Sequence, residues 1–276
     1  MPVLILSSEN KEREREIAEK IAQKLSYTTL NEQFLNRIAD KHILERKKLD
    51  AAMGSTPSIL KRMSVKWWHY SLSCVELEVL EQLVEDGCVC WGVSAHLYVM
   101  VISHVLKVRL IGGHDSVLQS DRHEKDRHKK DRHKKEIVRQ QRNREKWSMA
   151  AFNRKEADPG LYDMVINLDQ IQIDEVVNTL TTTLGYPRFK AMTYSNKNLK
   201  DQALAARVKN QLLKSLTDIH VHAQNGTVVV TTSSVKRERS KKIEKIKEIV
   251  GHVKGVGYLE VHWNKDIMTE AAMSCR

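Results

Sequence analysis

The chain has 276 residues, of which 41% are hydrophobic, while only 4 are proline and 11 are glycine. This composition excludes a disordered or collagen-like polymer, and the length suits two domains better than one. The formal charge of +11 indicates affinity for an anionic partner, without selecting among a nucleotide, a nucleic acid and an acidic lipid.

No segment approaches the roughly 20 apolar residues that are needed to span a bilayer. The N-terminal stretch also lacks the basic start of a signal peptide. The cysteines form no CxxC pair and no disulfide framework: Cys74, Cys88, Cys90 and Cys275. We therefore expect a soluble cytoplasmic protein whose cysteines are reduced and buried.

Residues 1–185 alternate short apolar runs with longer amphipathic segments, the order of a parallel sheet covered by helices. Helices are predicted over 11–25 and 173–184, where apolar residues recur three and four apart, and Asn31 is a candidate N-cap for a further helix. The predicted strands are 3–6, 88–91, 105–111 and 162–168. The sequence thus predicts a three-layer α/β domain.

A charged arm, residues 115–150, interrupts this pattern with three tandem pentapeptides, DRHEK, DRHKK and DRHKK. Each Asp precedes a Lys by four residues, which is favourable on a helix. A step of five residues turns about 140° on a helix, so His123, His128 and His133 fan apart, and a solvated helix is favoured over a metal site. Residues 121–146 hold twelve Lys/Arg and six Asp/Glu (12 − 6 = +6), a mixed pattern that argues against nucleic acid as a partner.

After residue 185 the pattern changes. Residues 186–199 are rich in turn-forming residues and predict a linker. Residues 200–266 predict a small α+β domain of order αββαβ, in which Asn225 and Gly226 close a hairpin. Its helices are expected over 204–213 and 240–253. His220 and His222 share one strand face, where a solvated surface is favoured over a metal pair.

Between the first strand and the first helix, where P-loop kinases hold the phosphates of a nucleotide, the sequence is SSENKERERE. Close approach of backbone N–H groups to phosphate requires glycines, whereas this segment has none and contains four glutamates. It resembles the opening of the cytidylate-kinase-like family, a strand followed by I-S-R-E-x-G-S-G-G-R-E-I-A. Ser7, Glu9 and residues 15–18 match, and the glycine-rich core of the family falls on residues 11–14.

Two further segments carry the resemblance. GVSA at 92–95 stands where the family has G-R-G-A, so the arginine is lost, and DPGLYDMVIN at 158–167 is similar to the family's D-P-x-L-Y-D-L-V-I-N. Arg144 and Phe152 match a basic and an aromatic position before it. The resemblance implies a P-loop kinase fold over 1–185 and, in an active member, ATP and Mg²⁺ as cofactors.

The resemblance also implies the site residues. A degenerate phosphate loop would consist of Ser7, Lys11, Arg13 and Arg15. Weaker matches imply substrate contacts at Asn31, Gly92 and Asp163. If the chain is active, lid arginines would contact the transferred phosphoryl group: Arg139, Arg142 and Arg144. No metal ligand is assigned.

Residues 202–263 are similar to the BON domain, a small αββαβ module. The similarity is carried by AARVK at 205–209, NGTVVVT at 225–231 and VKGV at 253–256. The resemblance implies an anionic lipid or a small ligand as the partner of this module, and it implies no catalytic role.

Glutamates in place of glycines block close approach to a triphosphate and repel it, and a clamping arginine is missing. The sequence therefore predicts an inactive or strongly impaired kinase that acts as a ligand-sensing or scaffold protein through its kinase-like and BON-like domains. The alternative is a divergent cytidylate kinase that transfers phosphate from ATP to CMP or dCMP, with Lys11, Arg13 and Arg15 offsetting the phosphate charge.

Overall fold

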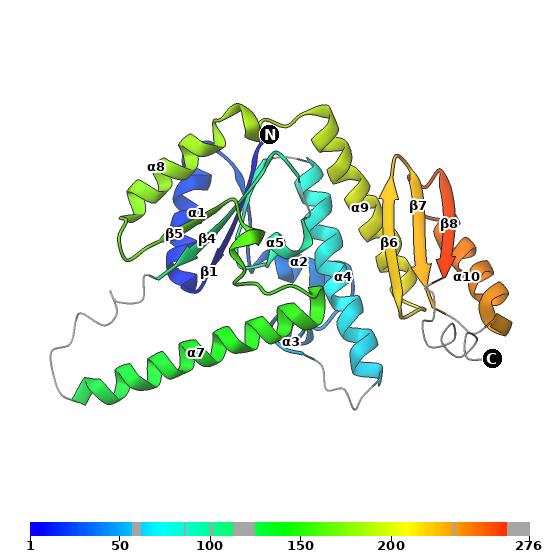
Figure 1. The fold of residues 1–276 in the computed structure, drawn as a ribbon, viewed down its shortest axis with the longest axis horizontal. Coiled ribbons are helices and arrows are strands. Elements are labelled where there is room, and N and C mark those ends of the chain that lie inside the picture. The colour runs from blue at the N-terminus through cyan, green and yellow to red at the C-terminus, as the bar shows by residue number, and fades with distance from the viewer. Residues whose placement is uncertain (57–61, 86, 100–101, 113–124, 234–235, 264–276) are drawn as a thin grey trace, which may run out of the picture.

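The structure is a computed structural model of the chain, and it describes residues 1–56, 62–85, 87–99, 102–112, 125–233 and 236–263. The described part contains a five-stranded sheet and a three-stranded sheet, joined by a long helix (Figure 1).

The larger sheet has the strand order β2-β3-β1-β4-β5, and all its neighbouring pairs are parallel. Its strands are β1 (Val3–Ser8), β2 (Thr28–Leu30), β3 (Cys88–Cys90), β4 (Val105–Ile111) and β5 (Met164–Asn167). β1 is central and buried along its whole length, as its uninterrupted apolar sequence predicts. β2 is an edge strand of three residues, which hydrophobic periodicity does not predict.

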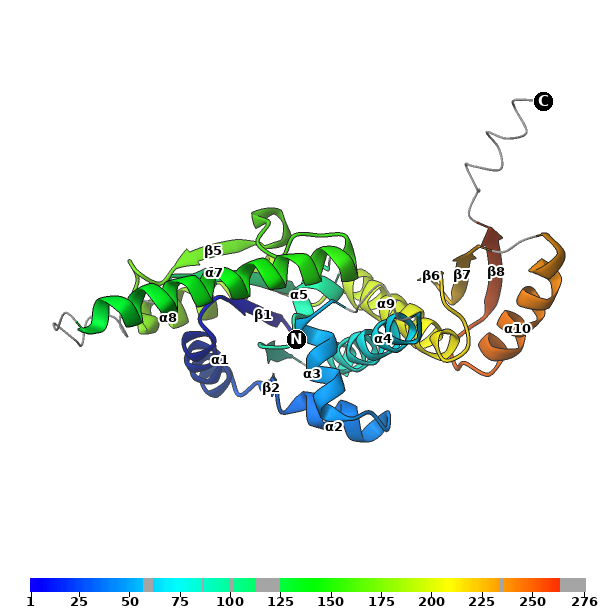
Figure 2. The ribbon, with the colours of Figure 1, turned by 90° about the horizontal axis from the view of Figure 1, so that it is seen from below.

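Helices cover both faces of this sheet, which confirms the predicted three-layer α/β architecture (Figure 2). On one face α1 (Lys11–Leu25) and α8 (Ile173–Leu184) pack against Leu4 and Leu6. The other face is covered by α2 (Phe34–Lys41), α3 (Arg46–Gly54), α4 (Arg62–Glu85) and α5 (Ala95–Tyr98). Three free cysteines are buried in this second core, as expected: Cys74, Cys88 and Cys90.

The charged arm is helical over α7 (Lys125–Phe152), in agreement with the prediction. The first part of the arm, including His123, lies outside the described residues, as do the side chains of His128 and His133. The N-terminal end of α7 reaches beyond the sheet (Figure 1), whereas Trp147 near its C-terminal end is only 1% exposed. Within the described ranges, no helix has both the length and the apolar character needed to cross a bilayer.

A single helix, α9 (Thr193–Leu213), contributes to both cores. It begins eleven residues before the predicted helix 204–213, so residues 193–199 of the predicted linker are helical. Leu199 is buried with the core of the large sheet, while Val208 and Leu212 face the core of the small one. The limits of the two domains stay a prediction.

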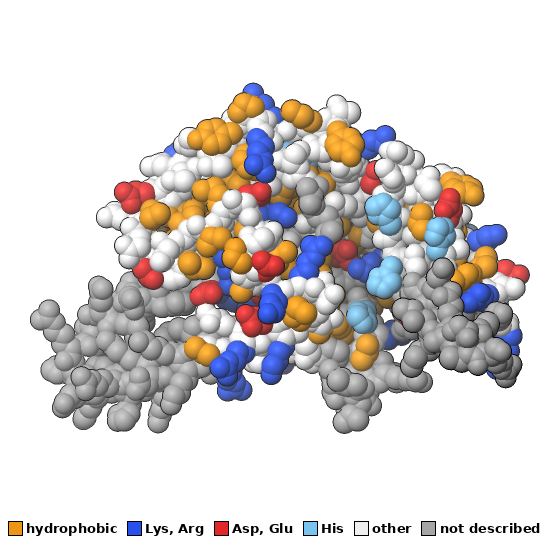
Figure 3. Space-filling model, viewed as in Figure 1, with side chains coloured by type: hydrophobic (Ala, Val, Ile, Leu, Met, Phe, Trp, Pro, Cys, Tyr) orange, Lys and Arg blue, Asp and Glu red, His pale blue; other side chains and the backbone are white. Residues whose placement is uncertain are grey.

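The C-terminal module then follows the predicted order, with β6 (Ile219–Gln224), β7 (Thr227–Thr232), α10 (Arg239–Gly251) and β8 (Tyr258–Trp263). β6 and β7 are antiparallel, and β7 and β8 are parallel. α9 and α10 cover one face of the sheet, and histidines gather over the other (Figure 3), where His220, His222 and His262 are exposed. The element order agrees with the prediction, while membership of the BON family stays a prediction.

Candidate functional site

The turn between β1 and α1 is short, because only Glu9 and Asn10 separate the strand from the helix. Asn10 caps the helix: its Oδ1 accepts from the backbone N–H groups of Glu12 and Arg13, each at 3.2 Å. Residues 11–14, where the family pattern has its glycines, form the first turn of α1. Lys, Glu and Arg favour helix, so a helical turn replaces a glycine-rich loop. Two N–H groups that a phosphate would require are therefore already bonded.

Replacing Asn10 by Ala is expected to lower the free energy of unfolding by about 1 kcal/mol, because two backbone N–H groups lose their acceptor. Denaturant unfolding followed by circular dichroism measures this loss. Gln33→Ala is the matched control, since Gln33 precedes α2 and its side chain makes no capping hydrogen bond. Equal losses at both positions would contradict the capping role of Asn10.

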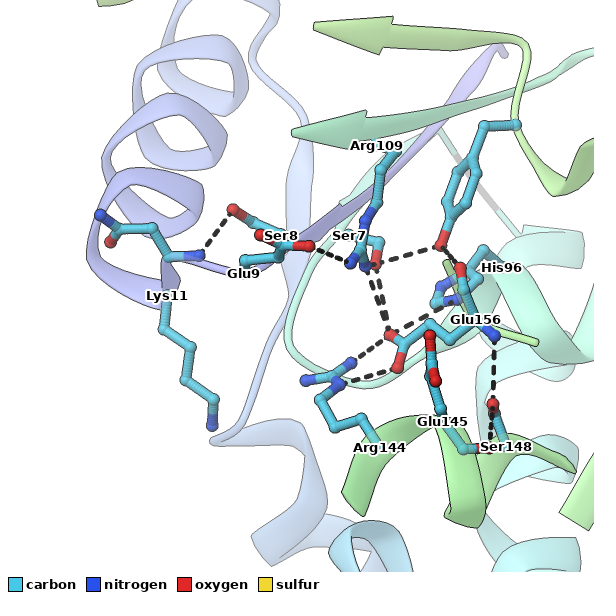
Figure 4. A network of polar contacts seen from close by, with 12 residues as sticks. Ser7, Ser8, Glu9, Lys11, His96, Arg109, Arg144, Glu145, Ser148 and Glu156 are labelled. Atoms are coloured by element: carbon cyan, nitrogen blue, oxygen red, sulfur yellow. Dashed lines mark hydrogen bonds and ion pairs between the residues drawn. The ribbon is translucent and has the colours of Figure 1, made fainter. Parts of the chain in front are cut away.

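Beside this turn, Ser7 of β1 and Arg109 of β4 lie in register at the carboxyl ends of the two strands (Figure 4). The Arg109 guanidinium is buried. It donates from Nη1 to Ser7 Oγ at 2.8 Å and from Nη2 to Glu9 Oε1 at 3.1 Å. The Tyr162 hydroxyl lies 3.3 Å from Ser7 Oγ. A buried arginine requires compensating negative charge, which Glu9 supplies only in part.

Glu156, from the segment between α7 and β5, supplies the remaining charge. Its Oε2 accepts from Arg144 Nε at 2.7 Å and its Oε1 accepts from Arg144 Nη2, while Arg109 Nη1 lies 3.8 Å from Oε1. The backbone of Glu156 is also held: its N–H donates to Ser148 Oγ at 3.1 Å, and its carbonyl accepts from the Tyr162 hydroxyl at 2.8 Å. Burial alone would raise the pKa of the carboxyl, but the hydrogen bond and charge of Arg144 hold this pKa below its ordinary value. Glu156 is therefore ionised.

Two more buried titratable groups flank this pair. Burial lowers the pKa of His96 to about 3, although Glu156 lies 3.7 Å away, so the imidazole is neutral at neutral pH. Neither of its ring nitrogens has a hydrogen-bond partner among the described residues. Burial raises the pKa of Glu14 to about 7, opposed by the charge of Arg144 and a hydrogen bond from the Gly92 N–H. Glu14 is thus partly protonated at neutral pH, whereas Glu156 is not.

A cavity of about 200 Å³ lies against this cluster. Its charged lining has three carboxylates and three cations, a net charge of 3 − 3 = 0: Glu9, Glu145, Glu156, Lys11, Arg109 and Arg144. Lys11 Nζ already bonds Glu32 Oε1 at 2.7 Å. The cavity is below the roughly 300 Å³ of the smallest pockets that enclose a drug-sized ligand, and its lining has no surplus of positive charge for a triphosphate.

A sequence model described as the cytidylate kinase-like family matches residues 12–170, which is more than half of the chain. The chain belongs to the cytidylate kinase-like family. The match begins in the first turn of α1 and ends after β5, so it lies within the parallel-sheet domain. A crystal structure of an uncharacterized protein from Eubacterium ventriosum ATCC 27560 is similar at 12% identity and a TM-score of 0.41, over 67% of this chain and 98% of that chain. No curated protein matches the chain.

The ATP that the family implies does not fit the start of α1. The Asn10 side chain occupies backbone N–H groups that would face the phosphates, and residues 11–14 place side chains where glycines would allow close approach. In the part of the chain that the structure describes, no three His, Cys, Asp or Glu side chains lie together in a way that could hold a metal ion.

The structure brings three of the predicted site residues, Ser7, Lys11 and Arg144, to the cluster or its cavity, and a hydrogen bond to Glu14 places Gly92 beside them. The other predicted site residues do not line the cavity. Arg13 and Arg15 form ion pairs with Glu16 and Glu19 along α1, and Arg139 and Arg142 are exposed on α7. Asn31 Oδ1 accepts a hydrogen bond from the Gln33 N–H, and Asp163 Oδ2 accepts one from the Lys107 N–H. Their binding roles stay predictions.

Four residues of the cluster are not predicted as site residues from the sequence: Arg109, Glu156, Glu14 and His96. Arg109 could have been predicted from its position. It lies inside the apolar strand VLKVRLI, and a charged residue that is buried in such a strand needs a partner of opposite charge. Glu156 could not have been predicted, because it lies 47 positions after Arg109 in the sequence (156 − 109 = 47) and only the fold brings the two residues together.

Proposed function

We propose that the parallel-sheet domain is a non-catalytic member of the cytidylate kinase-like family. The observation that carries this proposal is the Asn10 cap on a helical turn at residues 11–14. Phosphoryl transfer depends almost entirely on positioning and on preorganised donors. Removing a single such donor costs about 10²–10³-fold in rate in enzymes where it has been measured, and here the whole loop that would supply them is replaced.

The charges of the turn support the same proposal. Glu12 is exposed in the first turn of α1, and Glu9 precedes this turn. A carboxylate about 4 Å from a phosphate charge opposes binding by about 1–4 kcal/mol, depending on the effective dielectric. Lys11 does not offset this repulsion fully, because it is paired with Glu32.

In place of catalysis we propose a ligand-sensing or scaffold role for the parallel-sheet domain and the C-terminal module together. Arg207 pairs with Glu81 at 2.8 Å and Lys209 with Glu76 at 2.6 Å, and these ion pairs join α9 to α4. The sheet face of the module that no described helix covers is the surface that we assign to its ligand, an anionic lipid or a small molecule.

Formation of ADP from ATP, Mg²⁺ and CMP or dCMP tests this function. We expect a rate no higher than that of the double variant Lys11→Ala/Arg144→Ala, which lacks two cations of the cavity. Turnover at the usual kinase rate of about 1–100 s⁻¹, lost in the double variant, would contradict the proposal. Such turnover would favour a divergent cytidylate kinase, which the convergence of Lys11 and Arg144 on one cavity supports.

A further inference from the structure

Four side chains crowd around a single carboxylate oxygen, Oε1 of Glu156. Arg144 Nη2 bonds it directly. Three further groups surround the same oxygen at longer distances: Ser7 Oγ at 3.4 Å, His96 Nε2 at 3.7 Å and Arg109 Nη1 at 3.8 Å. Good hydrogen bonds to oxygen fall between about 2.5 and 3.2 Å. The carboxylate therefore bonds Arg144 well and Ser7 only at a long distance, while His96 and Arg109 lie beyond hydrogen-bond reach of it.

This arrangement suits an anion with more oxygens than a carboxylate has. His96 is 1% exposed and its ring nitrogens have no hydrogen-bond partner among the described residues, so a buried polar side chain faces the site without an acceptor or donor of its own. Arg109 and Arg144 add two positive charges, and arginine forks match phosphate geometry. Ser7 of β1 adds a hydroxyl group, which accepts a hydrogen bond from Arg109 Nη1.

We propose that Ser7, His96, Arg109 and Arg144 form a site for a small tetrahedral oxyanion such as phosphate, and that Glu156 is its built-in occupant. The inference rests on the proposed function, because a permanently filled site is expected only in a chain that does not transfer phosphate. The backbone of Glu156 is fixed on both sides of its Cα, because its N–H donates to Ser148 Oγ and its carbonyl accepts from the Tyr162 hydroxyl. The site is therefore filled without a free ligand. Because Glu156 contacts both Arg144 of α7 and Arg109 of β4, it also links α7 to the sheet.

Removing the Glu156 carboxylate should open the site to free phosphate. The cavity of about 200 Å³ already reaches Arg109, Arg144 and Glu156, so it gives a small anion a route to the arginines. We propose titration calorimetry and thermal unfolding of the full chain with inorganic phosphate, at an ionic strength held constant with chloride. The variants are Glu156→Ala and the isosteric Glu156→Gln. The control is Glu145→Ala, because Glu145 lines the same cavity but is exposed.

We expect Glu156→Ala to bind phosphate at least tenfold more tightly than the wild type and Glu145→Ala, and phosphate to raise its unfolding temperature. If Glu156→Ala folds only when phosphate is present, the inference is also supported. Folded Glu156 variants that bind phosphate no better than the wild type would overturn it, as would variants that phosphate cannot refold. These failures differ from failure of the proposed function, which shows itself as turnover of nucleotides by the wild type.

Discussion

Replacing Glu14 by Gln is expected to raise the free energy of unfolding by about 3 kcal/mol at pH 8 and to change it little at pH 4. The folded-state pKa of Glu14 is about 7, raised from an ordinary value of 4.5 chiefly by burial. Because folding raises the pKa of this carboxyl, its contribution to the free energy of unfolding is most favourable at pH values below 4.5, where it is protonated in both states. This contribution is lost as the pH rises from about 4.5 to about 7. Above that range the chain carries a buried negative charge, which the neutral amide does not.

Urea unfolding curves at pH 4 and pH 8 measure the effect. Glu12→Gln is the matched control, because Glu12 lies in the same helical turn and is exposed. We expect this control to change stability by no more than about 0.5 kcal/mol at either pH. A Glu14→Gln variant that is less stable than the wild type at pH 8 would show that the ionised carboxylate is stabilised by Arg144 more than burial penalises it.

Replacing Trp147 by Ala is expected to lower the free energy of unfolding by about 3–5 kcal/mol. The indole is 1% exposed and packs with Trp68, Leu72 and Leu97, and its Nε1 donates to the Ala52 carbonyl at 2.7 Å. Truncation leaves a cavity and removes the shorter of the two hydrogen bonds to the Ala52 carbonyl, which keeps the bond from Trp68 Nε1 at 3.0 Å. It also releases the end of α7 that carries Arg144.

The surface residue Met149, two positions further along the same helix and 39% exposed, provides the control for Trp147. Met149→Ala should cost no more than about 0.5 kcal/mol. Hydrogen exchange over 139–152 should accelerate in Trp147→Ala alone. Similar stabilities of the two variants would mean that α7 is not anchored through the indole.

The parallel sheet could be predicted because its inner strands are short apolar runs between amphipathic helices. The start of α9 could not, because Ser195, Asn196 and Asn198 are typical turn residues. Their helical conformation depends on Leu199, which is buried in the core of the large sheet. Tertiary packing thus overrides local preference at this point.

Some features of the candidate site could likewise be predicted from the sequence, and others could not. The loss of glycines is visible in the sequence, and the helix predicted over 11–25 is confirmed with its start at Lys11. Asn10 followed by Glu12 and Glu14 is a typical pattern for the N-terminus of a helix. The pairing of Glu156 with Arg109 is not visible, because it joins two segments that only the folded sheet brings together. Sequence therefore indicates what the turn lacks, while the structure indicates what replaces it.

We propose that a helical turn has replaced the phosphate loop, so that no nucleoside triphosphate is held there. Titration calorimetry of the full chain with ATP and excess Mg²⁺ tests this proposal. We predict no saturable binding at millimolar nucleotide, in the wild type and in the triple variant Lys11→Ala/Arg13→Ala/Arg15→Ala alike. Tight, saturable binding by the wild type that is abolished in the triple variant would contradict the claim.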